Sequence, residues 1–203
     1  MTYVKASVRR PSGNPGNGIQ PKDQLVIYDV DDILSFPQRN DAGVVIEDDI
    51  VMKAGRYAIG IYLTPGTAEI SSNSDGETDA EGYTPSVKFN HPGNEQEIRE
   101  FKTNWLSKKC IVVLRYCSGK PADLIGTPCN PCKLSVSYTG SNESNTNELT
   151  FTQISKGDDI AIYRGTDTLE EPVAVVEAGA TDMDYQTDGQ YQLSAGAAKI
   201  AGV

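Results

Sequence analysis

The sequence predicts a mainly β fold with one flanking α-helix, extended loops and terminal arms. Three observations support this class. Only residues 94–109 combine helical spacing of apolar side chains with helix-favouring ends. An unbroken apolar run at residues 111–114 follows directly. The remaining apolar residues fall in short runs separated by Gly, Pro, Asn and Asp, which is typical of strands joined by turns.

The predicted helix begins at Asn94, after a turn formed by His-Pro-Gly. Its apolar side chains, Ile98, Phe101 and Trp105, recur at helical spacing and share one face. Asn is a favoured N-cap residue, and Glu97 three residues later completes the pattern of a capping box. We therefore expect Asn94 to cap the helix and the aromatic face to pack on a core.

The strongest strand signal is the apolar run at residues 111–114, which contains no polar position. Such a run predicts a strand buried on both faces. Residues 24–30 predict the first strand, and residues 57–63 predict another strand with one larger face. Shorter strands are expected at residues 44–47, 50–52, 86–90, 124–126, 133–138, 149–152 and 160–163.

Two polar stretches predict long loops. Residues 64–84 carry five acids and no basic residue, and residues 139–148 are rich in Gly, Ser, Asn and Glu. Loops of this length are uncommon in compact domains and usually serve a function or are disordered. We expect both to lie at the surface.

The domain organisation predicted from these patterns has three parts. Residues 1–24, rich in Pro, Gly and Asn, predict an N-terminal arm, either a disordered tail or a segment that orders only against a neighbouring subunit. Residues 25–165 predict the β domain. Residues 166–203, rich in Ala, Gly, Asp and Thr, predict a small C-terminal β extension or arm, with weak strands at residues 173–176 and 191–193.

The charge is strongly asymmetric along the chain. The whole protein carries −10, whereas residues 1–24 carry a net +3, so the remainder carries −13. An acidic body is a poor phosphate binder, because binding needs Lys and Arg to displace counterions. No apolar run is long enough to span a bilayer, so no membrane partner is expected. The N-terminus lacks the pattern of a secretory signal, so we expect a protein made and used in a cytoplasm unless it leaves within a particle.

The four cysteines leave three interpretations open. Cys129 and Cys132 have the CxxC spacing of metal or redox sites, whereas Cys110 and Cys117 are seven residues apart and would point to opposite faces of one strand. A four-cysteine zinc site is therefore one candidate. A redox module is a second, although no βαβ pattern surrounds the CxxC. The third is a set of reduced, mostly buried thiols.

The sequence contains no arrangement typical of an enzyme. His91 is the only histidine, and no Gly-x-Ser-x-Gly elbow, phosphate loop or dinucleotide-binding glycine pattern is present. The carboxylates fall in polar stretches where solvent keeps them ionised. We expect a protein without catalytic activity and without a cofactor.

Five segments carry a resemblance to a known family. They are residues 19–33, residues 57–64 with the acidic stretch after them, residues 89–101 with the apolar run that follows, residues 124–134, and the late hairpin. Their order resembles that of phage tail tube proteins and of the related tube proteins of contractile injection systems, over about residues 19–165.

This resemblance implies a β-sandwich or half-open barrel with one flanking helix. It also implies a structural virion protein of the bacteriophage tail, assembled in the bacterial host cytoplasm beside other tail proteins. The subunits would form rings, expected to be hexameric, which stack into a tube through which DNA passes without specific binding. Residues 166–203 lie outside the resemblance.

The two polar stretches and the N-terminal arm are the expected inter-subunit contacts, because they are long and carry few core residues. The candidate contact residues are Ser71, Asp75, Glu77, Asp79, Glu81, Asn142, Asn145, Arg9 and Arg10.

Two other classes remain as alternatives. A phage capsid decoration or head-fibre protein would also be acidic, rich in strands and without a secretory signal, but it would bind a shell instead of forming tubes. A small metal-binding or redox module would depend on the cysteines. Electron microscopy of the purified protein separates the first alternative from a tube protein, and metal analysis decides the second.

Overall fold

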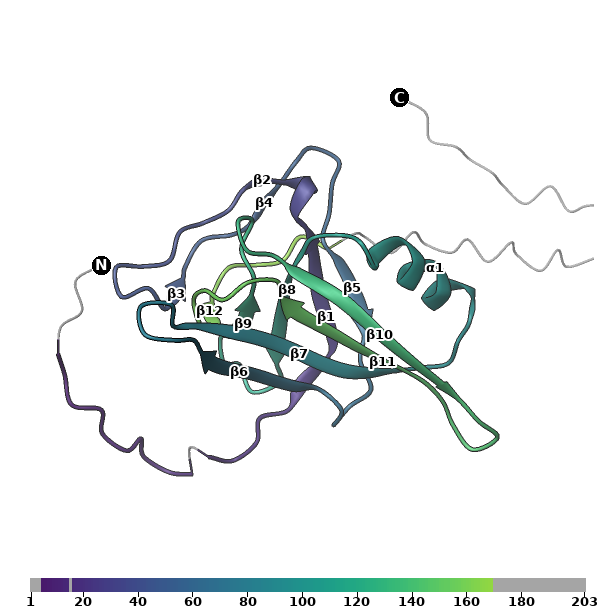
Figure 1. Cartoon of the computed structure of the whole chain (residues 1–203), viewed down its shortest axis with the longest axis horizontal. Coiled ribbons are helices and arrows are strands. Elements are labelled where there is room, and N and C mark those ends of the chain that lie inside the picture. The colour runs from purple at the N-terminus through teal and green to yellow at the C-terminus, as the bar shows by residue number, and fades with distance from the viewer. Residues whose placement is uncertain (1–4, 15, 170–203) are drawn as a thin grey trace, which may run out of the picture. The chain divides into compact units, whose positions relative to one another are not determined.

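The computed structural model describes residues 5–14 and 16–169 and shows a mainly β fold with one α-helix (Figure 1). The chain divides after Glu170, and all described residues belong to the first unit. Most of the predicted C-terminal extension, including its two weak strands, lies outside the described residues. Within the described ranges, no helix has the length and apolar character needed to cross a bilayer.

The strands range from two to eleven residues and follow one another closely along the chain. The first half forms β1 (Pro21–Asp29), the 3-10 helix η1 (Val30–Asp32), β2 (Ile33–Ser35), β3 (Val45–Ile46), β4 (Val51–Met52), β5 (Ile59–Tyr62) and β6 (Glu69–Asp75). The second half forms β7 (Gly82–Pro92), α1 (Gln96–Trp105), β8 (Cys110–Tyr116), β9 (Ala122–Ile125), β10 (Cys132–Gly140), β11 (Asn145–Gln153) and β12 (Ala161–Tyr163).

The antiparallel pair β1–β8 lies at the centre of the fold, with Val26 opposite Val113. Strand β5 flanks β1, while β9, β12 and β3 continue the sheet beyond β8. Because alternate side chains of a strand point to opposite faces, this pair supplies two separate cores. Residues 111–114 are buried on both faces, so that prediction is confirmed.

The first core lies between the β1–β8 pair and a sheet of four strands in the order β6–β7–β11–β10. Phe89 and Phe151 stack there with ring centroids 6.3 Å apart. The predicted apolar face of α1 covers one part of this core, with Ile98 buried and both aromatic residues packed against it. The buried members are Leu25, Ile27, Ile61, Leu63, Val87, Phe89, Ile98, Cys110, Val112, Leu114, Ile125, Cys132, Leu134, Leu149 and Phe151.

The second core lies on the opposite face of the β1–β8 pair. It is closed by β9, β12 and the segments around β3 and β4. Two tyrosines dominate it, and the hydroxyl of Tyr163 accepts a bond from the backbone N–H of Ile50 at 3.2 Å. The buried members are Val26, Tyr28, Ile46, Ile50, Ala58, Ile111, Val113, Ala122, Leu124, Ala161 and Tyr163.

The predicted helix cap is wrong. The N-cap residue is Glu95, and its side chain makes no capping bond. Asn94 lies one residue earlier, where its side-chain oxygen accepts a bond from Lys102 Nζ at 3.0 Å instead. The helix also ends at Trp105, earlier than predicted, because Lys108 lies past the helix and pairs with the buried Asp29.

Both predicted long loops contain strands instead. Residues 64–84 hold β6 and the start of β7, and the predicted strand at residues 86–90 is the middle of an eleven-residue strand. The second loop shortens to residues 141–144, because β10 and β11 pair along their full length. Ser, Thr and Asn favour loops in a sequence, but in these strands they occupy the solvent face of a sheet whose other face is buried.

The limits of the β domain extend past both predicted boundaries. Strand β1 begins at Pro21, inside the predicted arm. At the other end, Asp167 accepts a bond from the Tyr28 hydroxyl at 2.7 Å and pairs with Arg115. The guanidinium of Arg115 also donates to the Gly165 carbonyl at 2.7 Å. Burial and this carboxylate together raise the pKa of Tyr28, so the hydroxyl remains a donor.

This buried network makes Asp167 a test of where the domain ends. Replacing Asp167 with Ala leaves Arg115 and Tyr28 without their carboxylate, so the free energy of unfolding should fall by about 3–5 kcal/mol. Urea denaturation of the full chain measures this loss. The exposed Asp48→Ala variant is the control and should unfold as the wild type does. Equal stability of the two variants would contradict the role given to Asp167.

Candidate assembly surface

The four-stranded sheet β6–β7–β11–β10 has two open edges (Figure 1). On one side, β6 pairs with β7 alone among the described strands. On the other side, β10 pairs with β8 only where Cys132 lies opposite Cys110, and no described strand pairs with the rest of β10 on that side. Unpaired strand edges are templates for pairing with another chain.

The ladder shows which backbone groups are free on β10. The N–H of Ile154 donates to the Pro131 carbonyl. Cys132 and Gln153 are therefore a non-hydrogen-bonded pair of the antiparallel ladder. Bonding alternates along an antiparallel ladder. The N–H groups that point away from β11 therefore belong to Leu134, Val136 and Tyr138.

The same alternation reaches the opposite edge of the sheet. The backbone groups of Thr150 and Thr152 bond to β10, so those of Phe151, which lies between them, bond to Val87 of β7. Ser86 and Lys88, on either side of Val87, therefore bond to β6. The exchange of bonds between Tyr83 and Gly157 agrees with this assignment. The free N–H groups of β6 therefore belong to Ile70, Ser72 and Ser74.

The direction of the strands makes the two edges complementary. The four strands alternate in direction, so β6 and β10 run oppositely. A rotation about an axis parallel to the strands keeps each strand's direction, and it brings β10 of one copy beside β6 of the next in antiparallel orientation. The strands have seven and nine residues, so their lengths also match.

The outer face of this sheet is polar, with a small excess of acids. Paired residues share a face, and the face opposite the core carries hydroxyl and amide side chains with three acids and two Lys. Glu69 and Lys88 form an ion pair on it at 3.6 Å. None of the face residues is buried; they are Glu69, Ser71, Asn73, Asp75, Gly82, Thr84, Ser86, Lys88, Asn90, Pro92, Lys133, Ser135, Ser137, Thr139, Thr146, Glu148, Thr150 and Thr152.

The predicted contact residues of the acidic stretch fall into two groups. Ser71 and Asp75 belong to β6, where Ser71 shares a bond with Ser86 at 3.0 Å and Asp75 pairs with Lys156 at 3.1 Å. The pKa of Asp75 is lowered mainly by the hydrogen bond from Lys156 and, to a smaller extent, by the hydrogen bond from the Gly76 N–H. The other three are exposed in the turn before β7: Glu77, Asp79 and Glu81.

The remaining predicted contacts lie at the hairpin tip and in the arm. Asn142 is exposed in the turn between β10 and β11, and Asn145 accepts a bond from the Tyr138 hydroxyl at 2.7 Å. Arg9 and Arg10 are exposed in the arm. The structure does not bring these groups together into one site. The sequence analysis missed the open edge of β10, because alternation predicts a strand without predicting its partners.

No three of the four cysteines come together in the described part of the chain. Within residues 5–14 and 16–169, no three His, Cys, Asp or Glu side chains are arranged to hold an ion. Cys110 and Cys132 are buried and face each other, and the Cys110 thiol donates to the Cys132 carbonyl at 3.3 Å. Cys117 and Cys129 are exposed, so the expectation of mostly buried thiols holds for only half of them.

Comparisons with protein-family models, with curated proteins and with solved structures find no match to this chain. A function must therefore be argued from the geometry of its own residues.

Burial predicts a clear division of thiol reactivity. It raises the pKa of Cys110 to about 12 and also raises that of Cys132, so both remain protonated and shielded at neutral pH. Iodoacetamide should modify Cys117 and Cys129 in the native protein and all four thiols after unfolding. Intact-mass measurement counts the adducts. Four native adducts, or zinc retained after purification, would contradict this arrangement.

Proposed function

We propose that this protein is a structural subunit that assembles into stacked rings, forming the tube of a phage tail or of a related injection device. The observation that carries the proposal is the four-stranded sheet with two open, oppositely directed edges. The sequence resemblance to tail tube proteins supports the same function. The subunit acts without catalysis and without a cofactor.

In the proposed ring, β10 of each copy pairs with β6 of the next. The free N–H and carbonyl groups of the two edges then bond to each other, and ring closure leaves neither of these two edges exposed. Six copies, the number expected from the resemblance, would place about 24 strands around the axis. Barrels of roughly 16–18 strands already enclose an aqueous channel, so such a ring would have an open lumen.

The polar face suits the wall of a channel for DNA. A wall that binds DNA firmly needs an excess of Lys and Arg, because affinity arises from displaced counterions. On this face Lys88 and Lys133 are outnumbered by three acids, including Asp75. The hydroxyl groups between them keep the surface of the wall hydrated. The net charge of −10 on each subunit repels DNA, which is a polyanion. In this arrangement DNA slides and is not held.

The open edge of β6 offers a direct test. Ser74 is exposed and points its N–H away from the sheet, so Pro at this position removes an edge donor and no internal ladder bond. Ser74→Pro should fold, as judged by circular dichroism, but should remain monomeric at concentrations at which the wild type forms rings or hollow tubes. Light scattering and negative-stain electron microscopy measure this difference.

The matched control is Ser74→Ala, which keeps the N–H and should assemble as the wild type does. Normal assembly of Ser74→Pro would contradict the pairing of edges. A wild-type protein that remains monomeric and binds the outside of a capsid would instead indicate a decoration protein.

A further inference from the structure

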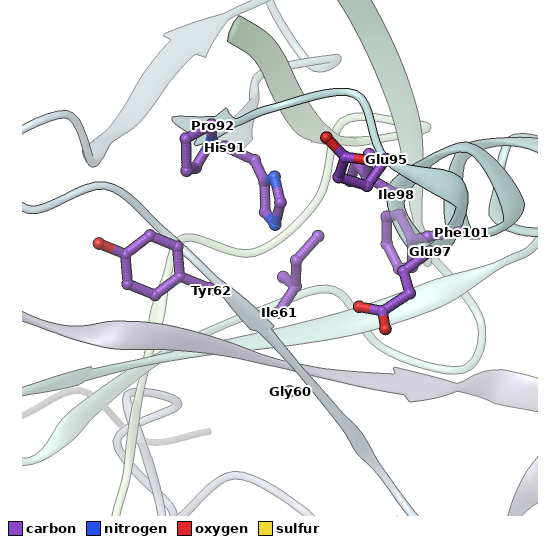
Figure 2. A pocket seen from close by; sticks show the side chains of 9 residues that line it. All are labelled: Gly60, Ile61, Tyr62, His91, Pro92, Glu95, Glu97, Ile98 and Phe101. Carbon is purple, nitrogen blue, oxygen red and sulfur yellow. The ribbon is translucent and has the colours of Figure 1, made fainter.

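A groove lies between β5, the end of β7 and α1 (Figure 2). It has a volume of about 360 Å³. In Figure 2, Ile61 lies between Tyr62 and His91 on one side and Glu97 and Phe101 on the other. Its lining side chains are mostly apolar, and the two that carry a charge are the exposed carboxylates Glu95 and Glu97.

One wall of this groove is the outer edge of β5, where the described chain bridges Ala58 through Leu169 and leaves Gly60 and Tyr62 without a partner strand. The N–H of Leu63 donates to the Asp23 carbonyl, so Gln24 and Tyr62 form a pair that does not exchange bonds, and Ile61 bonds to β1. The backbone groups of Gly60 and Tyr62 therefore point away from β1. No other described strand pairs with β5. The groove thus offers both an apolar floor and free backbone donors and acceptors.

The N-terminal arm has the chemistry that this groove requires. Residues 5–14 are exposed, and Val8 has 97% of its surface accessible, so its apolar side chain packs against nothing in its own subunit. In an extended conformation Ala6 and Val8 would share one face. Arg9 and Arg10 follow at once, and residues 1–24 carry a net +3.

We propose that the arm of a second copy docks in this groove, where it adds a short strand to the open edge of β5. Ala6 and Val8 would cover Ile61, while the two arginines reach the carboxylates of the rim. Strand addition gains affinity from backbone bonds and specificity from alternate side chains. This inference rests on the proposed function, because it supplies a contact between subunits separate from the pairing of β6 with β10.

The length of the arm allows this contact. Val8 lies thirteen residues before Pro21, and an extended chain spans about 3.3 Å per residue, so Val8 can reach about 43 Å from the start of β1. A domain of this size has a radius of gyration of about 15 Å, so an arm can cross from one subunit to a neighbour.

Disulfide cross-linking between two full-length copies tests the proposal. Both copies carry Cys117→Ser and Cys129→Ser, which removes the exposed native thiols. One copy, labelled with ¹⁵N, carries Val8→Cys, and the other carries Tyr62→Cys in the groove. The control partner carries Leu34→Cys, which is 67% exposed and lies outside the groove. After mild oxidation, intact mass measures the yield of the mixed dimer.

We expect the Val8–Tyr62 pairing to exceed the Val8–Leu34 control by at least about fivefold. Adding Arg9→Glu and Arg10→Glu should lower the yield about fivefold, since two rim ion pairs are lost. Adding Glu95→Lys and Glu97→Lys to the partner should restore it. A yield equal to the control, or no response to charge reversal, overturns the proposal.

Two further outcomes separate this inference from the proposed function. If electron microscopy shows rings but no mixed dimer forms, arm docking is overturned, whereas the proposed function as a tube subunit is not contradicted. The mixed dimer without rings supports arm docking and contradicts the tube. With both cysteines on one chain, a cross-link that forms only within that chain overturns docking in a second copy.

Discussion

The fold depends on the burial of one strand pair on both of its faces. Because β1 and β8 have almost no polar side chains at their centre, each face needs its own cover, and the chain supplies two different ones. The four-stranded sheet and α1 cover one face, and the segments around β3, β4 and β12 cover the other. The four-stranded sheet therefore lies at the side of the domain. One of its faces is buried against the first core, and the other is exposed to solvent.

The same arrangement explains why the sheet edges are open. An exposed edge is a hazard that proteins usually blunt with short strands, Pro or charged side chains. Here β6 and β10 are long, and their edge positions include Ile70, Leu134 and Val136. Open edges of matched length and opposite direction are consistent with a partner of the same kind. The edge of β5 is shorter and opens into a groove, which suits a single added segment better than a second sheet.

The mainly β class, the single helix and the doubly buried strand followed from sequence because each has a strong local pattern. The helix cap, the two long loops and the domain limits did not. Asn94 has the correct residue type for a cap, but its side chain bonds to Lys102. The strands β6 and β10 carry many Ser, Thr and Asn residues on their solvent face, which hides their alternation. Asp167 joins the core through Arg115, 52 residues earlier, and no local pattern reveals such a contact.

Hydrogen–deuterium exchange before and after assembly tests the central claim most directly. If the sheets join edge to edge, the amides of Ile70, Ser72 and Ser74 in β6 should become protected on assembly. The amides of Leu134, Val136 and Tyr138 in β10 should become protected with them, while the internal ladder between β7 and β11 should change little. Assembly without new protection at these six amides would contradict the account.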